Sequence, residues 1–300
     1  MVQLTRSLTG TRRRPMGMRN QRRIGLAVKL VVMFLGLIFA LLPVAYVISA
    51  SLNPANTLVG LGLIPRDITF DNFARLFTSP LQPWPRWILN SFIVAGTTAI
   101  IVTSLTALAA YAFSRLRFRF RRLGMIALVI VQLFPNMLAF VALFLLLDAL
   151  KDVVPAIGLN SLGGLILIYS GGALGFNTWL MKGYFDTLPV DLDESAMVDG
   201  ATHVQAFWYI ILPLVRPILA VIGILTFISA YADFLIARVM LSSTENYTLA
   251  VGMTLFVREY QLEWGTFAAA ALVGAAPVLL VFLIFQRQLV GGLAQGGVKG

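Results

Sequence analysis

Long apolar runs alternate with polar connections along the whole chain, and this pattern predicts a bundle of membrane-spanning helices. A helix needs about 20 mainly apolar residues to cross a hydrocarbon core of about 30 Å. Sufficiently long runs lie near residues 24–50, 87–113, 124–147, 161–181, 218–240 and 266–286. We therefore expect an all-α, polytopic membrane protein with six transmembrane helices.

The composition agrees with that pattern. Of the 300 residues, 59% are hydrophobic and 12% are charged, whereas soluble domains average about 45–50% apolar and about 25% charged residues. We divide the chain into a basic N-terminal tail (1–23), one transmembrane domain (24–286) and a C-terminal tail (287–300). Because the first apolar run exceeds the roughly 7–15 residues of a signal-peptide core, we expect an uncleaved span.

The positions of lysine and arginine indicate the orientation of the bundle. If the N-terminus is cytoplasmic, 16 of the 23 basic residues fall in the inside segments 1–23, 114–122, 182–217 and 287–300. Such an excess is typical of cytoplasmic loops, so we expect both termini in the cytoplasm. The net charge of +10 then reflects topology and contact with anionic membrane lipid. The arginines lie beside spans without a recognition fold, so we expect no nucleic-acid partner.

The connection between the fourth and fifth runs is polar and acidic. Its centre reads DLDESAMVDGATHVQAF, a pattern typical of two short helices. Asp191 with Glu194, and Thr202 with Gln205, have the spacing of capping boxes. Gly200 lies between them, where a left-handed residue would close the first helix. We therefore expect a stiff helical surface outside the bilayer.

The second short helix is expected to carry an apolar stripe. The stripe consists of Val204, Phe207, Trp208 and Ile211. These residues have the i, i+3, i+4 and i+7 spacing that places side chains on one face of a helix. Pro213 and Pro217 follow and limit regular continuation of this helix into the next span. His203, the single histidine, is expected to be exposed or to touch a partner.

The same connection resembles a known family. Permease subunits of binding-protein-dependent ABC importers carry the pattern E-A-A-x3-G-x9-I-x-L-P, and this chain matches it at Glu194, Ser195, Ala196, Gly200, Ile210, Leu212 and Pro213. Ser195 replaces the usual alanine. Further segments resemble the smaller membrane subunit of the maltose/maltodextrin importer and its relatives, and they are GYFDTLP (183–189), NYTLAVGM (246–253) and the closing GGVKG. The resemblance covers nearly the whole chain from the first span onward.

The resemblance implies a type I permease fold, a location in the bacterial inner membrane and a set of partners. These are a homologous second permease subunit, two ATPase subunits, and a periplasmic or lipoprotein sugar-binding protein. The loop 182–217 would contain a coupling helix that contacts an ATPase through Glu194, Ser195, Ala196, Asp199, Gly200, Ala201 and Pro213. The periplasmic loop 241–264 would reach the binding protein through Asn246, Tyr247, Thr248, Leu249, Ala250, Val251, Gly252 and Met253. The tail would extend between the ATPase subunits through Gly296, Gly297, Val298, Lys299 and Gly300.

Other positions have local interpretations. Asp233 is a carboxylate inside an apolar run, which is costly at the bilayer centre, so it faces either the translocation path or the outer interface. Trp84 and Trp87 are expected at the membrane interface. The basic turn 114–122 is an orientation anchor with snorkelling side chains or a partner site. The glycine-rich C-terminal tail is expected to be flexible.

The function expected from these features is transport powered by a partner. The chain has no G-x-x-x-x-G-K-[ST] phosphate loop, so it cannot bind ATP by that route, and we expect no enzymatic activity. Without cysteine and with one histidine, no metal or cofactor is expected. The leading hypothesis is a permease for maltose/maltodextrin or a related α-glucoside that alternates between inward- and outward-facing states. The alternatives are a permease of this class for another sugar such as trehalose, a secondary transporter, and an integral-membrane enzyme.

Overall fold

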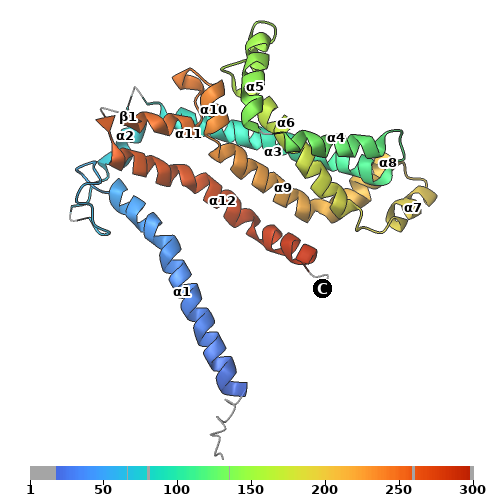
Figure 1. The fold of residues 1–300 in the computed structure, drawn as a ribbon, viewed down its shortest axis with the longest axis horizontal. Coiled ribbons are helices and arrows are strands. Elements are labelled where there is room, and N and C mark those ends of the chain that lie inside the picture. Colours follow the sequence, from blue (N-terminus) through green and yellow to red (C-terminus); the bar gives the residue numbers. More distant parts are fainter. Residues whose placement is uncertain (1–17, 66, 80–81, 135, 259–260, 298–300) are drawn as a thin grey trace, which may run out of the picture.

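The computed structural model describes residues 18–65, 67–79, 82–134, 136–258 and 261–297. This part of the chain is helical except for loops and one pair of two-residue antiparallel strands, β1 (Val257–Arg258) and β2 (Gln261–Leu262). The long helices are α1 (Met18–Ser51), α3 (Trp84–Arg115), α6 (Leu162–Phe185), α9 (Leu212–Ala232) and α12 (Trp264–Gly297). The shorter α-helices are α2 (Asp71–Thr78), α4 (Arg121–Leu133), α5 (Asn136–Lys151), α7 (Asp191–Val198), α8 (His203–Ala206), α10 (Leu235–Met240) and α11 (Leu249–Gly252). The expected all-α architecture is confirmed (Figure 1).

Within the described residues, five helical stretches are long and apolar enough to cross a membrane. They are Gly25–Ser51, Trp84–Arg115, Leu162–Phe185, His203–Ala232 and Trp264–Gln286. The third predicted span, 124–147, is not one straight helix. It consists of α4 and α5, which are bent by 104°, because Pro135 disfavours a helical conformation of the residue before it, and Phe134 is extended with ψ 129°.

The fifth predicted span, 218–240, is also corrected. The helical stretch begins earlier, at His203, and ends at Ala232; Asp233 is extended, with ψ 127°, before α10 begins. The two prolines do not end this stretch. The irregularity falls instead on a π-helical turn, Phe207–Ile211, directly before α9. A π-helical turn of this kind is a bulge within an α-helix, where the backbone hydrogen bonds join residues five positions apart instead of four.

The described part of the C-terminal tail is helical, whereas its glycines predicted a flexible segment. Helix α12 continues to Gly297, while Val298, Lys299 and Gly300 lie outside the described residues. Each helical glycine costs about 1 kcal/mol relative to alanine. Elongation of an existing helix adds a backbone hydrogen bond per residue. Leu289 and Val290 precede the first glycine pair, and Leu293 and Ala294 separate it from the second.

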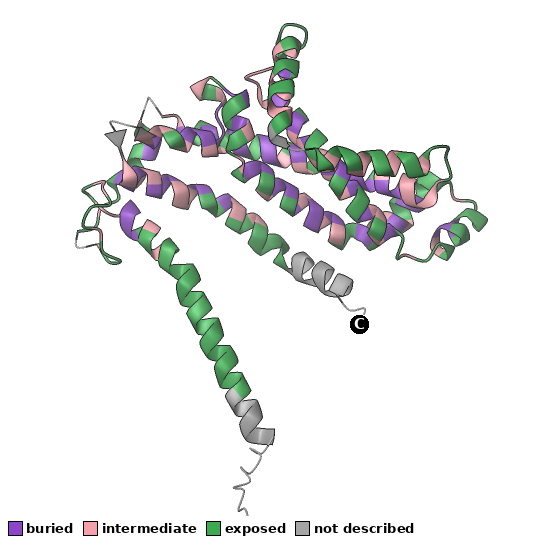
Figure 2. Ribbon diagram, in the orientation of Figure 1, coloured by how far each residue is buried: buried purple, intermediate pink, exposed green. Residues whose placement is uncertain are grey.

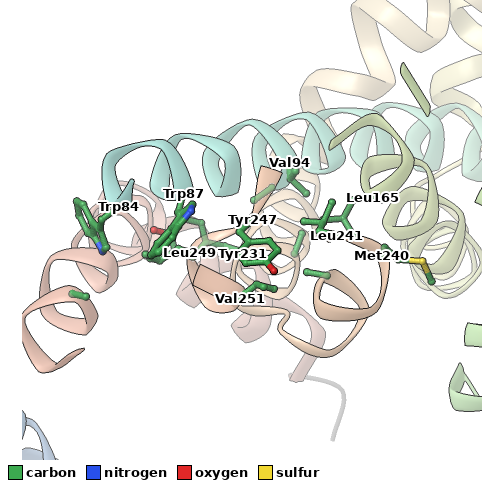
Figure 3. Packing of buried hydrophobic residues seen from close by; sticks show 14 of the residues in the cluster. Trp84, Trp87, Val94, Leu165, Tyr231, Met240, Leu241, Tyr247, Leu249 and Val251 are labelled. Atoms are coloured by element: carbon green, nitrogen blue, oxygen red, sulfur yellow. The ribbon is translucent and has the colours of Figure 1, made fainter. Parts of the chain in front are cut away.

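Among the described residues the core has two clusters, one near each end of α3. The first gathers Trp84, Trp87 and Val94 of α3 with Leu165, Tyr231, Met240, Leu241, Tyr247, Leu249 and Val251 (Figure 3). The second includes Tyr111 with Phe185, Phe207 and Ile211. Trp84 and Trp87 are 2% and 0% exposed, because α2 and α11 pack on this end of α3. The two indoles therefore do not face lipid, as interfacial anchors would.

Helix α1 stands largely apart from this core. Its residues 25–44 are exposed (Figure 2), and it meets α12 only toward its C-terminal end (Figure 1). The predicted outer segments, in contrast, are tied together. Asn160 Oδ1 accepts hydrogen bonds from the Ser242 and Ser243 amides, at 2.9 and 3.0 Å, and Asn56 Oδ1 accepts one from Gly265 N at 2.6 Å. The predicted cytoplasmic connections lie at the opposite end of α3.

Candidate functional site

The connection between α6 and α9 forms the helical surface that the sequence predicts, with Gly200 at its corner. Gly200 has φ +88°, the left-handed conformation that favours glycine. Gly200 N donates to Met197 O at 3.1 Å, and Ala201 N donates to Ala196 O at 2.9 Å. This pair of bonds is a Schellman motif, and it fixes the angle between α7 and α8.

Of the two predicted capping boxes, one is present. Thr202 Oγ1 accepts from Gln205 N at 3.3 Å, and Gln205 Oε1 accepts from Thr202 N at 2.8 Å. The box at Asp191 is wrong, because α7 already includes Asp191 and Val190 occupies the N-cap without a side-chain bond. The acidic residues therefore lie in the first turn, where they interact favourably with the helix dipole.

The predicted partner residues of this connection are mostly accessible. Glu194, Ser195, Asp199 and Gly200 are exposed, Ala201 and Pro213 are partly buried, and Ala196 is buried. The predicted apolar stripe is split: Phe207 and Ile211 are buried, whereas Val204 and Trp208 are 66% and 53% exposed. The π-helical turn changes which residues share a face. We call the exposed residues Glu194, Ser195, Val198, Asp199 and Val204 the α7–α8 surface.

Beneath this surface lies a buried ion pair that the sequence did not reveal. Arg115 Nε contacts Asp193 Oδ2 at 2.7 Å, and the two side chains are 5% and 3% exposed. Tyr111 Oη donates to Asp193 Oδ1 at 3.1 Å, and Arg115 Nη2 donates to Leu188 O at 2.9 Å. The pair fastens α7 to the end of α3. A hint existed in the sequence, since the basic turn and the acidic connection were both predicted on the cytoplasmic side.

A second, more exposed cluster adjoins the ion pair. Asp186 accepts a hydrogen bond from Ser114 Oγ at 2.7 Å and pairs with Lys182. Burial alone would raise the pKa of the Asp186 carboxyl, but the hydrogen bonds and the positive charges of Lys182 and Arg121 outweigh it and lower the pKa. Arg121 Nη2 also donates to Ser114 O at 3.0 Å, which satisfies a carbonyl at the end of α3. Arg115 and Arg121 are thus internal ties, which neither interpretation of the basic turn foresaw.

At the other end of α3, much of the predicted binding-protein segment is buried. Thr248, Leu249 and Val251 are 1%, 4% and 0% exposed, and Gly252 is buried. Trp87 Nε1 donates to Thr244 O at 2.8 Å. Residues 246–253 therefore form the anchored base of the outer loop, and its remainder includes β1 and β2.

Asp233 lies at the break between α9 and α10. Its Oδ1 accepts from Tyr169 Oη at 2.7 Å and from the Ile236 and Ala237 amides at 3.1 and 3.2 Å. It also lines a cavity of about 1180 Å³ whose polar side chains include Thr98, Gln132, Tyr169, Asn177, Thr226 and Ser229. The carboxylate thus caps a helix and faces a cavity at the same time, a combination consistent with a polar group inside a membrane bundle.

The comparisons with known proteins agree with these features. Residues 103–294 match the family described as "Binding-protein-dependent transport system inner membrane component". The maltose/maltodextrin transport system permease protein MalG of Photorhabdus laumondii is 42% identical over 281 residues, which cover 90% of this chain and 94% of that protein. MalG of Vibrio vulnificus is 48% identical over 223 residues, covering 74% of this chain and 75% of that protein.

Solved structures show the same fold. A chain of a bacterial ABC transporter involved in the import of the acidic polysaccharide alginate has a TM-score of 0.74 and 26% identity, covering 91% of this chain and 99% of that one. A chain of a bacterial alginate ABC transporter, solved in complex with an alginate pentasaccharide-bound periplasmic protein, has a TM-score of 0.65 and 20% identity, covering 89% and 94%. The expected permease fold is confirmed. With the family pattern, the relatives and the apolar helices in agreement, this chain belongs to the multi-pass inner-membrane components of binding-protein-dependent transport systems.

Proposed function

We propose that this chain is a membrane subunit of an ATP-driven importer for maltodextrins or related α-glucosides, with both termini in the cytoplasm. The α7–α8 surface docks on an ATPase subunit, the outer loop 241–264 contacts a sugar-binding protein, and a homologous permease subunit completes the pathway. The chain itself is non-catalytic. A permease of the same class for another sugar, such as trehalose, is the alternative.

The observation that carries the proposal is the α7–α8 surface. It combines exposed carboxylates, Glu194 and Asp199, with exposed apolar Val198 and Val204. An amphipathic helical surface of this kind fits a cleft on a partner. Its backbone is fixed by the Gly200 motif, and it rests on the buried Arg115–Asp193 pair, so a displacement of this surface is transmitted to α3.

Two further features support import rather than docking alone. The cavity beside Asp233 lies among α4, α5, α6 and α9 and presents hydroxyl and amide groups, which can replace the hydration of a sugar. The sugar class itself rests on the similarity to MalG proteins. For the C-terminal segment, we propose that Gly296, Gly297 and the residues after them contact the ATPase subunits.

The proposal is tested by reconstituting the chain in vesicles with the second permease, the ATPase and the binding protein of its own transport system. We expect maltotriose uptake that requires ATP and all four components. Trehalose uptake with no maltotriose uptake would identify the alternative sugar. Uptake driven by an ion gradient without ATP would instead identify a secondary transporter.

A further inference from the structure

The two partner-facing regions lie at opposite ends of one helix, α3. At its outer end, Asn90 Nδ2 donates to Tyr247 O at 2.9 Å, and Ser91 Oγ accepts from Leu249 N at 2.8 Å. Asn90 and Ser91 are 5% and 1% exposed. The outer loop is thus held by buried side-chain bonds to α3, and such bonds are costly to leave unmade.

At its inner end, the same helix holds the coupling region. The Tyr111 hydroxyl lies 3.1 Å from Asp193 Oδ1 and 3.2 Å from His203 O and shares its one proton between these two acceptors, so it touches α7 and the first residue of α8. Arg115 adds the buried ion pair with Asp193. Tyr111 and Arg115, at the inner end of α3, therefore hold both α7 and α8.

We call Asn90 with Ser91 the outer clamp and Tyr111 with Arg115 the inner clamp. Between these two clamps α3 is a stiff element. It spans 32 residues, with a proline only in its first turn, which corresponds to about 48 Å at about 1.5 Å per residue. By comparison, α1, α9 and α12 each contain an interior proline, at Pro43, Pro217 and Pro277. Interior prolines kink helices, and the α4–α5 pair is bent outright. Helix α3 also packs along its length against α6 and α9.

We infer that α3 is the mechanical link between the outer loop and the coupling region, with Asn90 and Ser91 as positioning residues at one end and Tyr111 and Arg115 at the other. A displacement imposed on either end moves the other, because both clamps grip the same unbroken helix. The two clamps therefore act in series. This inference rests on the proposed docking of the ATPase and the binding protein at the two ends.

Series coupling has a signature that independent effects lack. Ser91→Ala loosens the outer clamp and Tyr111→Phe the inner one, and both substitutions remove only an oxygen atom. The readout is a ratio measured in the full complex: the rate of ATP hydrolysis with the maltotriose-loaded binding protein, divided by the basal rate without it. Each single variant should lower this ratio by about fivefold or more, since fivefold is the lower end of usual coupling strengths. Since a link that fails at one end transmits nothing and the ratio cannot fall below one, a single variant that abolishes the stimulation should be matched, and not exceeded, by the double variant.

Thr106→Val is the matched control. Thr106 is a fully buried residue of α3 between the clamps, and its hydroxyl has no hydrogen-bond partner among the described residues. This near-isosteric change should leave the ratio at the wild-type value. Wild-type ratios in both single variants, or losses that multiply in the double variant, overturn the link while leaving the proposed function intact. A wild-type complex that the loaded binding protein does not stimulate overturns the proposed function, and the inference with it.

Discussion

Gly252 lies directly against the indole of Trp87. A Cβ atom at position 252 would come within 2.2 Å of the ring atoms Cδ2 and Cε3. Trp87 is fully buried, and its ring also packs edge-to-face on Phe256 at a centroid distance of 6.0 Å. The outer loop therefore packs closely on α3 because Gly252 has no side chain, in addition to the hydrogen bonds that hold the loop.

Gly252→Ala should destabilise the protein by about 1–3 kcal/mol, the usual cost of adding a methyl group to a filled core. Thermal unfolding of the detergent-solubilised protein measures this. Gly183→Ala is the control, because Gly183 lies within α6 and a Cβ there meets no atom within 4 Å. That variant should be neutral or more stable by up to about 1 kcal/mol, from helix propensity. Equal stability of the two variants would contradict the tight fit.

Gly200→Val should abolish coupling without preventing membrane insertion. Valine is strongly disfavoured at φ +88° because it is β-branched, so the angle between α7 and α8 cannot be kept. Gly200→Asn should retain much of the function, since asparagine tolerates this conformation. Co-purification with the ATPase and maltotriose uptake provide the measurements. Equal function of the valine and asparagine variants would show that this backbone geometry is not needed.

Local patterns predicted local structure well in this chain. Hydrophobic periodicity located the long helices, and the Gly200 corner and the Thr202–Gln205 box followed from residue types whose backbone preferences are strong. The Asp191 cap failed because the competing start lies a single residue away, and boundaries are set by energies of about 1 kcal/mol.

Tertiary relationships were out of reach of the same patterns. Hydropathy treats each segment alone, so it could not tell that α2 and α11 would cover Trp84 and Trp87. The pairing of Arg115 with Asp193 joins residues 78 positions apart and has no periodic signal. Asp233 was recognised as a costly carboxylate, yet its role as a cap became visible only with the break after α9.

The buried ion pair should be asymmetric in its response to substitution. Asp193→Ala leaves the Arg115 guanidinium buried without its counter-charge, which costs about 3–5 kcal/mol. Replacing both residues by apolar ones, Arg115→Met with Asp193→Leu, should recover much of this loss because no charge is then buried. Thermal unfolding of the single and double variants tests this. A double variant less stable than Asp193→Ala would contradict it.

Asp186 predicts a pH dependence on the predicted cytoplasmic side. Its pKa is lowered from the ordinary value of 3.8, so the folded protein binds the proton less readily than the unfolded chain. Its contribution to stability is therefore fully present above about pH 4 and is lost as pH falls through the lowered pKa. The contribution is modest, because the side chain is 43% exposed. The stability difference between wild type and Asp186→Asn should shrink below pH 4; a difference that grows would contradict the sign.

Substitutions at Asp233 can separate its role as a helix cap from a role on the translocation path. Asp233→Asn keeps an oxygen for the Ile236 and Ala237 amides, whereas Asp233→Ala removes the acceptor. The alanine variant should therefore lose stability, by about 1–2 kcal/mol as for other helix caps, and the asparagine variant less. If the carboxylate also faces a wet translocation path, a cysteine at position 233 of this cysteine-free chain should react with a water-soluble thiol reagent. Ala220, in the middle of α9 and away from the cavity lining, gives the matched cysteine control. The control should stay unreactive. No reaction at 233 in any nucleotide state of the complex would leave Asp233 as a cap alone, and equal reaction at 220 and 233 would show that the reagent does not report on the cavity.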